Sequence, residues 1–316
     1  MRLRCAVLDD YQGVAAGLAD WSSVELTVHR EHFSSRDALV SALRDVEVVV
    51  VMRERTPFDA DLFSRLPSLR LLVTSGMRNA SIDLGAAAAA GVVVCGTGST
   101  SGPPVELTWA LILGLARHVV VENSAFRADG PWQSTVGTGL AGKTLGLLGF
   151  GKIGVQVGRV ARAFGMSVAA WSANLTAERT AAEGVRLAGS LEELAGRSDV
   201  LSVHLVLSER TRGVVDASVL GLLKPSAFFV NTSRAGLVDQ AALVEALVGG
   251  RIAGAGLDVF EEEPLPAGHV LRRLPNVLAT PHIGYVTDGN YSVYFREAVE
   301  DILAFAAGSP VRVISG

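Results

Sequence analysis

The sequence predicts an α/β protein of two domains, each built around a doubly wound parallel sheet. Its 316 residues are more than one hydrophobic core usually organises. Hydrophobic residues make up 49% of the chain and aromatic residues only 6%, a composition typical of α/β proteins filled with small aliphatic side chains. Apolar runs of strand length alternate with helical stretches along most of the chain, which is the pattern of parallel sheets with crossover helices.

The first domain is predicted to cover residues 1–99. Its strand-like apolar runs lie at residues 4–8, 24–29, 46–52, 69–74 and 92–95. Two helices are expected between them, at residues 59–66, ended by a proline, and at residues 81–90, ended by a glycine. The following segment, residues 96–104, is rich in Gly, Ser and Pro, so we place the first domain boundary there.

The second domain is predicted to cover residues 100–286, with residues 287–316 returning to the first. A long helix is expected from Val105, followed by a turn at residues 128–132. Six strand-like runs then lie at residues 144–148, 167–171, 200–205, 227–231, 254–259 and 277–279. Six strands with intervening helices are typical of a nucleotide-binding sheet. A last helix, residues 290–307, is expected to cross back to the first domain.

Composition and charge argue against several classes of function. The formal net charge is −4, without a basic block, so nucleic acid is not an expected partner. The first apolar run is too short for a signal peptide, and the run at residues 107–121 is broken by Arg117 and His118 and is shorter than a membrane span. We therefore expect a cytoplasmic protein with no membrane contact, in which this run is a buried helix. Cys5 and Cys95 lack metal-ligand spacing, so we expect two buried thiols and no metal site.

A glycine-rich loop reads GFGKIG at residues 149–154, between an apolar strand and a helix. Gly149 permits a tight turn, Gly151 lets the backbone approach a pyrophosphate, and Gly154 lets helix and strand pack closely. The N-terminus of the helix presents free amide groups to negative charge. The loop therefore predicts a Rossmann dinucleotide site, whose contacts come from Gly149, Gly151, Lys152, Ile153 and Gly154.

The adenosine ribose of such a cofactor is usually held by an acidic residue at the end of the second strand. Ser172 stands at that position, and no arginine follows it directly. Arg179, seven residues on, could reach a 2′-phosphate or could be a solvated helix residue. We therefore expect NAD(H) or NADP(H) as the cofactor, with the preference open and Ser172 as a candidate contact.

Three polar side chains follow predicted strands, at the edge where a doubly wound sheet places its ligand crevice. Arg234 follows the strand FFVN, Glu263 lies in GLDVFEEEP, and His282 lies in TPHIGY. An arginine binds a carboxylate through two parallel hydrogen bonds and keeps its charge. A histidine can supply the proton that a ketone oxygen needs during reduction, and a carboxylate beside a histidine favours the protonated ring. These residues form the predicted catalytic set.

At this point the chain resembles the D-isomer-specific 2-hydroxyacid dehydrogenase family over nearly its whole length. The motifs that carry the resemblance are LPSLRLLVTSGMRNASIDL, GFGKIG, NTSRAGLVD, GLDVFEEEP and PHIG. The resemblance implies a Rossmann cofactor domain inserted in a discontinuous, flavodoxin-like substrate domain. It also implies an NAD(P)-dependent oxidoreductase acting on a small 2-oxo or 2-hydroxy acid, and a homodimer. In it, Arg234 binds the substrate carboxylate and carbonyl, His282 transfers the proton, and Glu263 is the partner of His282.

The resemblance implies further contacts with cofactor and substrate. Asp258 matches the family residue beside the nicotinamide carboxamide, with a helix cap as the alternative. Backbone amides of the loop after the fourth strand are expected to bind the substrate carboxylate, helped by Arg53 and Arg55. The loop residues are Gly76, Met77, Arg78 and Asn79. His204, which follows a buried strand, is expected to be structural.

Departures from the family leave the substrate open. Met77 and Arg78 are large residues for the substrate loop and suggest an unusual acid. Aromatic side chains either lie near the crevice or pack the last helix against the first domain, namely Tyr285, Tyr291, Tyr294 and Phe295. A nucleotide-sensing corepressor could keep the same three catalytic residues, and a formate dehydrogenase typically has glutamine at the position of Glu263. Reduction of a small 2-oxo acid remains the leading hypothesis.

Overall fold

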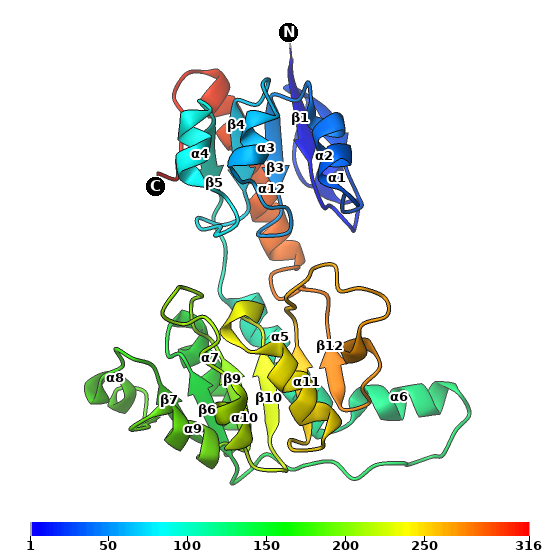
Figure 1. The fold of residues 1–316 in the computed structure, drawn as a ribbon, viewed down its shortest axis with the longest axis vertical. Helices are drawn as coiled ribbons and strands as arrows, with labels where there is room; N and C mark the ends of the chain where they lie inside the picture. Colours follow the sequence, from blue (N-terminus) through cyan, green and yellow to red (C-terminus); the bar gives the residue numbers. More distant parts are fainter. Residues whose placement is uncertain (1, 316) are drawn as a thin grey trace. The chain divides into compact units, whose positions relative to one another are not determined.

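The computed structural model describes residues 2–315 and divides into two compact units (Figure 1). Unit 1 combines Met1–Thr100 with Val286–Gly316, and unit 2 is Ser101–Tyr285. These bounds differ by one residue from the expected domain boundaries. The chain therefore leaves unit 1 once, forms unit 2, and returns with its last helix.

Unit 1 is built on a five-stranded parallel sheet with the strand order β2-β1-β3-β4-β5. Its strands are β1 (Leu3–Val7), β2 (Val24–Val28), β3 (Val48–Val51), β4 (Leu71–Thr74) and β5 (Val93–Gly96). Every residue of β3 and β4 is buried, because a parallel sheet is covered on both faces. The order is that of flavodoxin-like folds, in which the connection changes direction between β1 and β3.

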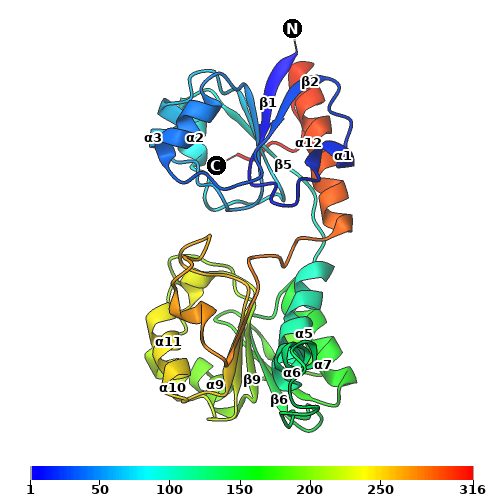
Figure 2. The same cartoon turned by 90° about the vertical axis from the view of Figure 1, so that its right-hand side faces the viewer.

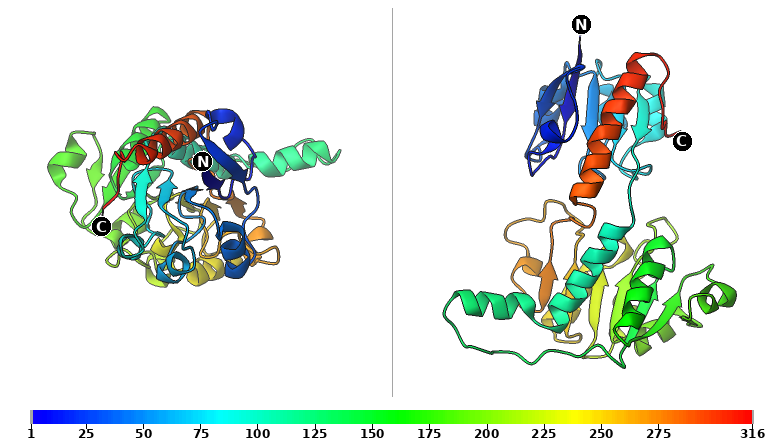
Figure 3. Two further views of the ribbon diagram at one scale, coloured as in Figure 1. Left: turned by 90° about the horizontal axis from the view of Figure 1, so that it is seen from above. Right: turned by 180° about the vertical axis from the view of Figure 1, so that it is seen from behind.

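The helices of unit 1 are α1 (Ala15–Leu18), α2 (Arg36–Leu43), α3 (Ala60–Ser64), α4 (Leu84–Ala89) and α12 (Asp288–Ala306). Helix α4 begins later than expected because Asp83 is its N-cap and accepts a hydrogen bond from the Ala86 amide. Helix α12 contacts α1 and β4, and it lies across one face of the sheet (Figures 2 and 3).

The inner face of α12 explains why the last helix belongs to unit 1. Tyr291, Tyr294 and Phe295 are buried, and the Phe295 ring lies 6.4 Å from the ring of Trp21. Burying aromatic side chains is among the largest single contributions to a hydrophobic core. These three residues therefore pack the last helix against unit 1. This is one of the two roles expected from the sequence, the other being a position near the crevice.

Unit 2 is built on a seven-stranded parallel sheet with the order β12-β11-β10-β9-β6-β7-β8. Its strands are β6 (Thr144–Leu148), β7 (Ser167–Trp171), β8 (Arg186–Leu187), β9 (Val200–Val203), β10 (Phe228–Asn231), β11 (Gly254–Leu257) and β12 (Val277–Ala279). The six strands β6 to β11 stand in the order β8-β7-β6-β9-β10-β11, which is the dinucleotide-binding order 3-2-1-4-5-6, and β12 extends the sheet beyond β11. The sequence prediction missed β8, because a two-residue edge strand containing an arginine carries no apolar run.

The helices of unit 2 are α5 (Gly102–Ala116), α6 (Val119–Arg127), α7 (Lys152–Ala163), α8 (Ala177–Ala181), α9 (Leu191–Arg197), α10 (Ala217–Gly221) and α11 (Gln240–Val248). Two short 3₁₀ turns lie at Ala235–Leu237 and Val270–Arg272. Helix α7 follows the glycine-rich loop directly, as the motif predicts.

The expectation of one buried helix over residues 107–121 was wrong in its second part. Helix α5 buries seven of its residues, but it ends at Ala116, and His118 adopts a left-handed conformation with φ 51°. Helix α6 then starts in a new direction with no buried residue. Among residues 2–315 no single helix is long and apolar enough to cross a membrane, although α5 and α6 together meet the length and composition criteria across a 66° bend. Cys5 and Cys95 are buried free thiols, as expected.

Candidate active site

The glycine-rich loop joins β6 to α7, and each of its glycines has a different structural reason. Gly149 has φ +104°, a conformation that side chains other than glycine rarely adopt. A Cβ there would also lie 2.7 Å from the His204 carbonyl. A Cβ on Gly154 would collide with the Gly149 carbonyl oxygen. Gly149 and Gly154 are therefore required by the packing of the loop itself.

Gly151 differs, because a Cβ at this position would meet no atom within 4 Å. It is the exposed N-cap residue of α7, so its backbone can be approached closely from outside. The amides of Lys152 and Ile153 lie in the first turn of α7, where an α-helix leaves its N–H groups without helical partners. The loop therefore fits a pyrophosphate group, which these amides would hold.

Ser172 follows the last residue of β7 and is half-exposed. Its carbonyl accepts a hydrogen bond from the Leu175 amide, which turns the chain toward Thr176, the N-cap of α8. Arg179 is exposed and is the third residue of α8. It therefore lies in the first turn of this helix.

The predicted catalytic residues follow three neighbouring strands of unit 2. The strand ends are in register, since Asn231 of β10 pairs with Leu257 of β11, and Leu257 pairs with Ala279 of β12. Arg234 and His282 each lie three residues beyond their strand. Parallel strands end at the same edge, so this arrangement places both residues at the carboxyl edge of the sheet.

His282 and Glu263 form a close pair at this edge. The Nδ1 atom of His282 lies 2.6 Å from Oε2 of Glu263, and their side chains are 14% and 26% exposed. The other carboxylate oxygen, Oε1, accepts a hydrogen bond of 2.9 Å from the Phe260 amide. A carboxylate partner on Nδ1 orients the ring and assigns the Nδ1 proton to this bond. The Nε2 atom has no hydrogen-bond partner among residues 2–315, so it can face a substrate.

Asp258 holds the loop that carries His282. Its Oδ1 accepts hydrogen bonds from the Thr280 hydroxyl (2.7 Å) and the Ile283 amide (2.8 Å). Its Oδ2 accepts one from the Gly284 amide (2.8 Å). Burial raises the pKa of Asp258, and the hydrogen bonds from Thr280 and Ile283 oppose that shift. Asp258 is buried and its observed bonds all hold the His282 loop, so the expected carboxamide contact stays a prediction.

Arg234 is held by its own loop. Its carbonyl accepts a hydrogen bond of 3.0 Å from the Asn231 side chain, and its Nη1 donates to the Ser233 carbonyl at 2.7 Å. The Ser233 hydroxyl in turn donates to the Leu205 carbonyl at 2.7 Å. These contacts tie the arginine to the ends of β10 and β9.

The loop after β4, in unit 1, departs from its expected role at Gly76. The Gly76 amide already donates a hydrogen bond of 2.9 Å to the Thr97 hydroxyl, so it is not available to a substrate. The amides of Met77 and Arg78 donate to no acceptor among residues 2–315, and both residues are exposed. Of the amides expected to bind a carboxylate, the Gly76 amide is therefore occupied, whereas the Met77 and Arg78 amides are free to donate.

Asn79 is a structural residue of this loop. Its Nδ2 donates to the Arg53 carbonyl at 2.7 Å and to the Thr74 hydroxyl at 2.9 Å, and its Oδ1 accepts from the Ser81 amide at 3.0 Å. The side chain therefore has its donors and acceptor occupied inside unit 1. Its expected role as a substrate contact is limited to its backbone.

Arg53 and Arg55 both lie after β3 but differ in their surroundings. Arg53 has φ +54° and donates through Nη1 to the Ser75 carbonyl at 3.4 Å. A Cβ on Gly76 would collide with its guanidinium, so Arg53 lies directly against the loop. Arg55 is buried and donates to the Asp9 carbonyl at 2.6 Å. Arg53 is therefore the better placed of the two for a ligand of this loop.

Two further observations concern residues outside the predicted set. The structural role expected for His204 is confirmed, because its Nε2 lies 2.9 Å from the Ser202 hydroxyl and burial lowers its pKa to about 4. Sequence reasoning missed Thr97 and Thr280, which order the substrate loop and the His282 loop. Their only signal is a position just beyond a strand, which many threonines share.

Comparisons with known proteins agree with this geometry. Residues 109–284 match the model of the D-isomer specific 2-hydroxyacid dehydrogenase, NAD binding domain. The chain is 38% identical to the glyoxylate reductase of Aeropyrum pernix, with 86% of this chain and 83% of that protein covered. It is 37% identical to the hydroxypyruvate reductase of Thermotoga maritima over 83% of this chain and 85% of that protein.

Longer relatives and solved structures extend the comparison. The chain is 37% identical to the D-3-phosphoglycerate dehydrogenase of Bacillus subtilis, with 83% of this chain but only 50% of that protein covered. The chain thus spans about half of that relative. The structure of a phosphoglycerate oxidoreductase from Vibrio cholerae o395 superposes with a TM-score of 0.93 at 36% identity, covering 97% of this chain and 100% of that chain. The protein therefore belongs to the D-isomer-specific 2-hydroxyacid dehydrogenase family and is a 2-hydroxyacid oxidoreductase with a nicotinamide cofactor.

Proposed function

We propose that the protein reduces a small 2-oxo acid to the D-2-hydroxy acid, with NADH or NADPH as the reductant. The observation that carries this proposal is the pair of His282 and Glu263, with Nε2 of His282 left for a substrate oxygen. When bound, the nicotinamide supplies the hydride. The carbonyl oxygen then needs one proton, and the protonated ring of His282 donates it from Nε2.

Arg234 and the loop after β4 provide the means to bind the acid. The guanidinium of Arg234 can form charge-assisted hydrogen bonds with the carboxylate and the ketone oxygen, which polarises the ketone. In unit 1, the free amides of Met77 and Arg78 and the adjacent Arg53 cation are groups of the kind that bind a carboxylate.

The substrate is best sought among acids related to those of the relatives. We propose a screen of glyoxylate, hydroxypyruvate, pyruvate and larger 2-oxo acids with both reduced cofactors. Relatives named as glyoxylate and hydroxypyruvate reductases support the small acids. Turnover of at least one acid is expected, and absence of any turnover would contradict the proposal. None of the reported relatives supports the corepressor alternative.

Glu263→Gln should move the alkaline limit of reduction toward lower pH. A neutral amide cannot stabilise the imidazolium of His282 as a carboxylate does, although it can still accept the bond from the Phe260 amide. A charge-assisted hydrogen bond is stronger than a neutral one, and the direction of the shift is the expected result. The pH profile of kcat/KM measures it. An unchanged or alkaline-shifted limit would mean that Glu263 does not act on His282.

The residue at position 172 should control the choice of cofactor. Ser172 lacks the carboxylate that would accept bonds from the ribose hydroxyls and repel a 2′-phosphate. We therefore propose that the wild type uses both cofactors within roughly two orders of magnitude, a gap of about 3 kcal/mol. Ser172→Asp should shift preference toward NAD(H), and Arg179→Ala should weaken NADP(H) more than NAD(H).

The ratio of kcat/KM for NADH and NADPH in the three proteins provides the measurement. Arg186→Ala is a matched control, since Arg186 is also a partly exposed arginine of unit 2 and pairs with Glu193 at 2.8 Å. A wild type that discriminates more than a thousandfold, together with an unmoved ratio in Ser172→Asp, would exclude this position from ribose recognition.

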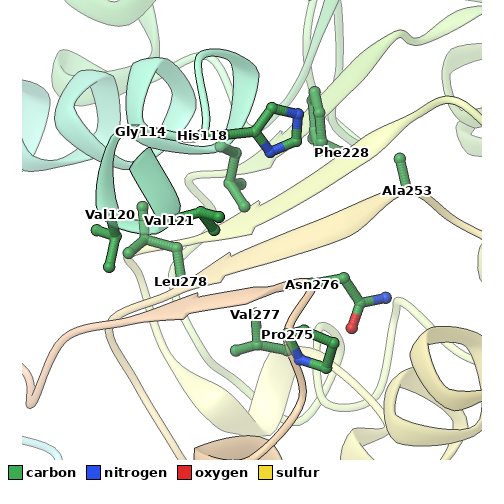
Figure 4. A pocket seen from close by; sticks show the side chains of 11 residues that line it. Gly114, His118, Val120, Val121, Phe228, Ala253, Pro275, Asn276, Val277 and Leu278 are labelled. Atoms are coloured by element: carbon green, nitrogen blue, oxygen red, sulfur yellow. The ribbon is translucent and has the colours of Figure 1, made fainter. Parts of the chain in front are cut away.

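We also propose that the protein is a homodimer formed through α6 and the segment after it. Apolar side chains are exposed there, including Phe126 (66%), Trp132 (82%) and Val136 (94%), and large exposed apolar patches mark association surfaces. Where α5 meets α6, a cavity of ≈ 260 Å³ is open beside β12 and lined by His118, Val121 and Leu278 (Figure 4). Sedimentation equilibrium should give about twice the chain mass of 33.1 kDa, and a monomer at micromolar concentration would contradict the dimer.

A further inference from the structure

The segment after α12 runs along the free edge of the unit 1 sheet. Strand β5 is the last strand in the order. The Ile314 amide donates to the Val94 carbonyl at 2.8 Å, and the Gly96 amide donates to the Arg312 carbonyl at 3.0 Å. An antiparallel bridge joins Cys95 and Val313 between these bonds. The segment therefore occupies backbone groups that an edge strand would otherwise expose.

Arg312 anchors this segment to α12. Its φ of +50° is uncommon for a residue with a side chain, so its contacts must hold it there. Its Nε lies 3.0 Å from Oδ1 of Asp301, and its Nη2 donates to Oε2 of Glu300 at 3.0 Å and to the Glu297 carbonyl at 2.9 Å. Asp301 is completely buried. Burial raises the pKa of Asp301 to about 7, and the Arg312 cation opposes that shift.

A second connection leads from this anchor to the end of β5. The carboxylate of Glu297, 3.8 Å from Nε of Arg312, accepts a hydrogen bond of 2.6 Å from the Gly98 amide through Oε2. Arg312 and Glu297 therefore hold the backbone at Gly96 and at Gly98, on either side of Thr97. The hydroxyl of Thr97 accepts the hydrogen bond from the Gly76 amide.

The end of β5 lies directly against the loop of residues 76–79. A Cβ on Gly96 would lie 2.6 Å from the Gly76 carbonyl oxygen, 2.9 Å from Cδ1 of Ile314 and 3.1 Å from Cα of Met77. Gly96 is thus enclosed between the loop and the Ile314 side chain. Gly96 therefore cannot move toward the loop unless Gly76 or Met77 moves as well.

We propose that Arg312 and Ile314 are positioning residues that fix the substrate loop through the end of β5. The inference rests on the proposed function for the role of the Met77 and Arg78 amides as carboxylate donors. The loop that exposes these amides follows β4 and packs against the end of β5, the edge strand, which pairs in this sheet with β4. The segment 312–314 supplies the missing support on the other side.

The test compares Arg312→Ala, Arg312→Lys and Ile314→Ala with the wild type. Displacement of the loop should raise KM for the 2-oxo acid roughly fivefold or more, since small misplacements of binding groups cost considerable activity. The kcat and the affinity for the reduced cofactor should stay within about twofold, because Arg234, His282 and the glycine-rich loop belong to unit 2. Arg312→Lys keeps the charge but not the geometry of three separate contacts, so it should show a smaller increase.

Arg296→Ala is the matched control. Arg296 also lies beside two of these acidic residues, 3.7 Å from Glu297 and 3.7 Å from Glu300. Its side chain is 59% exposed, and both of these ion pairs are with residues of α12. It should leave KM unchanged. An equal increase of KM in Arg296→Ala would show that loss of charge on α12, and not the support of β5, is responsible.

Hydrogen exchange gives a readout that does not depend on activity. The hydrogen-bonded amides of Ser75 and Gly76 should exchange at least threefold faster in Arg312→Ala and Ile314→Ala, with β1 and β3 unchanged. Unchanged exchange of the loop, or an equal increase throughout unit 1, would overturn the inference. If the wild type reduces no 2-oxo acid, the proposed function fails while this measurement still decides whether the segment holds the loop.

Discussion

His282→Ala is expected to lower kcat by a factor on the order of 100 or more, about 2.7 kcal/mol of transition-state stabilisation. The ring is the proposed proton donor and is held by Glu263, and alanine leaves the carbonyl oxygen to take its proton from water. Binding of the reduced cofactor should remain near normal, because the glycine-rich loop and the His282 loop follow different strands. The measurement combines steady-state turnover of the best 2-oxo acid with a fluorescence titration of the cofactor.

His269→Ala is the control for loss of a histidine from unit 2. His269 accepts a hydrogen bond from the Leu271 amide through Nδ1 and has no carboxylate partner among residues 2–315. Its replacement should leave turnover within about twofold of the wild type, since surface changes are usually small. Near wild-type turnover by His282→Ala would remove His282 from the mechanism.

Arg234→Lys should lower kcat/KM by roughly 30-fold or more, equivalent to about 2 kcal/mol. An ammonium group is a point donor and cannot bind the carboxylate and the ketone oxygen side by side as a planar guanidinium does. Lysine also cannot reproduce the bond from Nη1 to the Ser233 carbonyl while reaching the substrate. Cofactor affinity should change little, so the loss should appear with the 2-oxo acid as the varied substrate.

Arg251→Lys provides the comparison for this substitution. Arg251 is 52% exposed and pairs with Glu245 at 3.6 Å, an ion pair of the kind that contributes little. Its kinetics should match those of the wild type. A loss of less than threefold in Arg234→Lys would show that the double contact is not used in the transition state.

Much of the fold and of the candidate site could be predicted because the relevant signals are local. The apolar runs that became β6, β7 and β12 were predicted with their observed bounds, since a buried strand needs consecutive apolar residues. The glycine-rich loop was predicted from its glycine spacing between an apolar strand and a helix, and positive φ at Gly149 and close packing at Gly154 are why side chains are excluded there. The pairing of His282 with Glu263 came from a family resemblance, and the structure places them 2.6 Å apart.

The tertiary structure decided what depends on partners distant in the sequence. The Gly76 amide donates its hydrogen bond to the hydroxyl of Thr97, 21 residues away. The motif GMRN does not predict that acceptor. The carboxylate of Asp258 accepts hydrogen bonds from the amides of residues 283 and 284. The position of an aspartate at the end of a strand does not predict these partners. The break between α5 and α6 lies at His118, without a glycine or proline, where the backbone turns left-handed and α6 continues with no buried residue. By itself the sequence determined the strands other than β8, the cofactor loop and the chemistry of the catalytic residues. Only the tertiary structure decided which polar groups are occupied by hydrogen bonds and which stay free. The reason is that each hydrogen-bond partner is selected by distance in space and not along the chain.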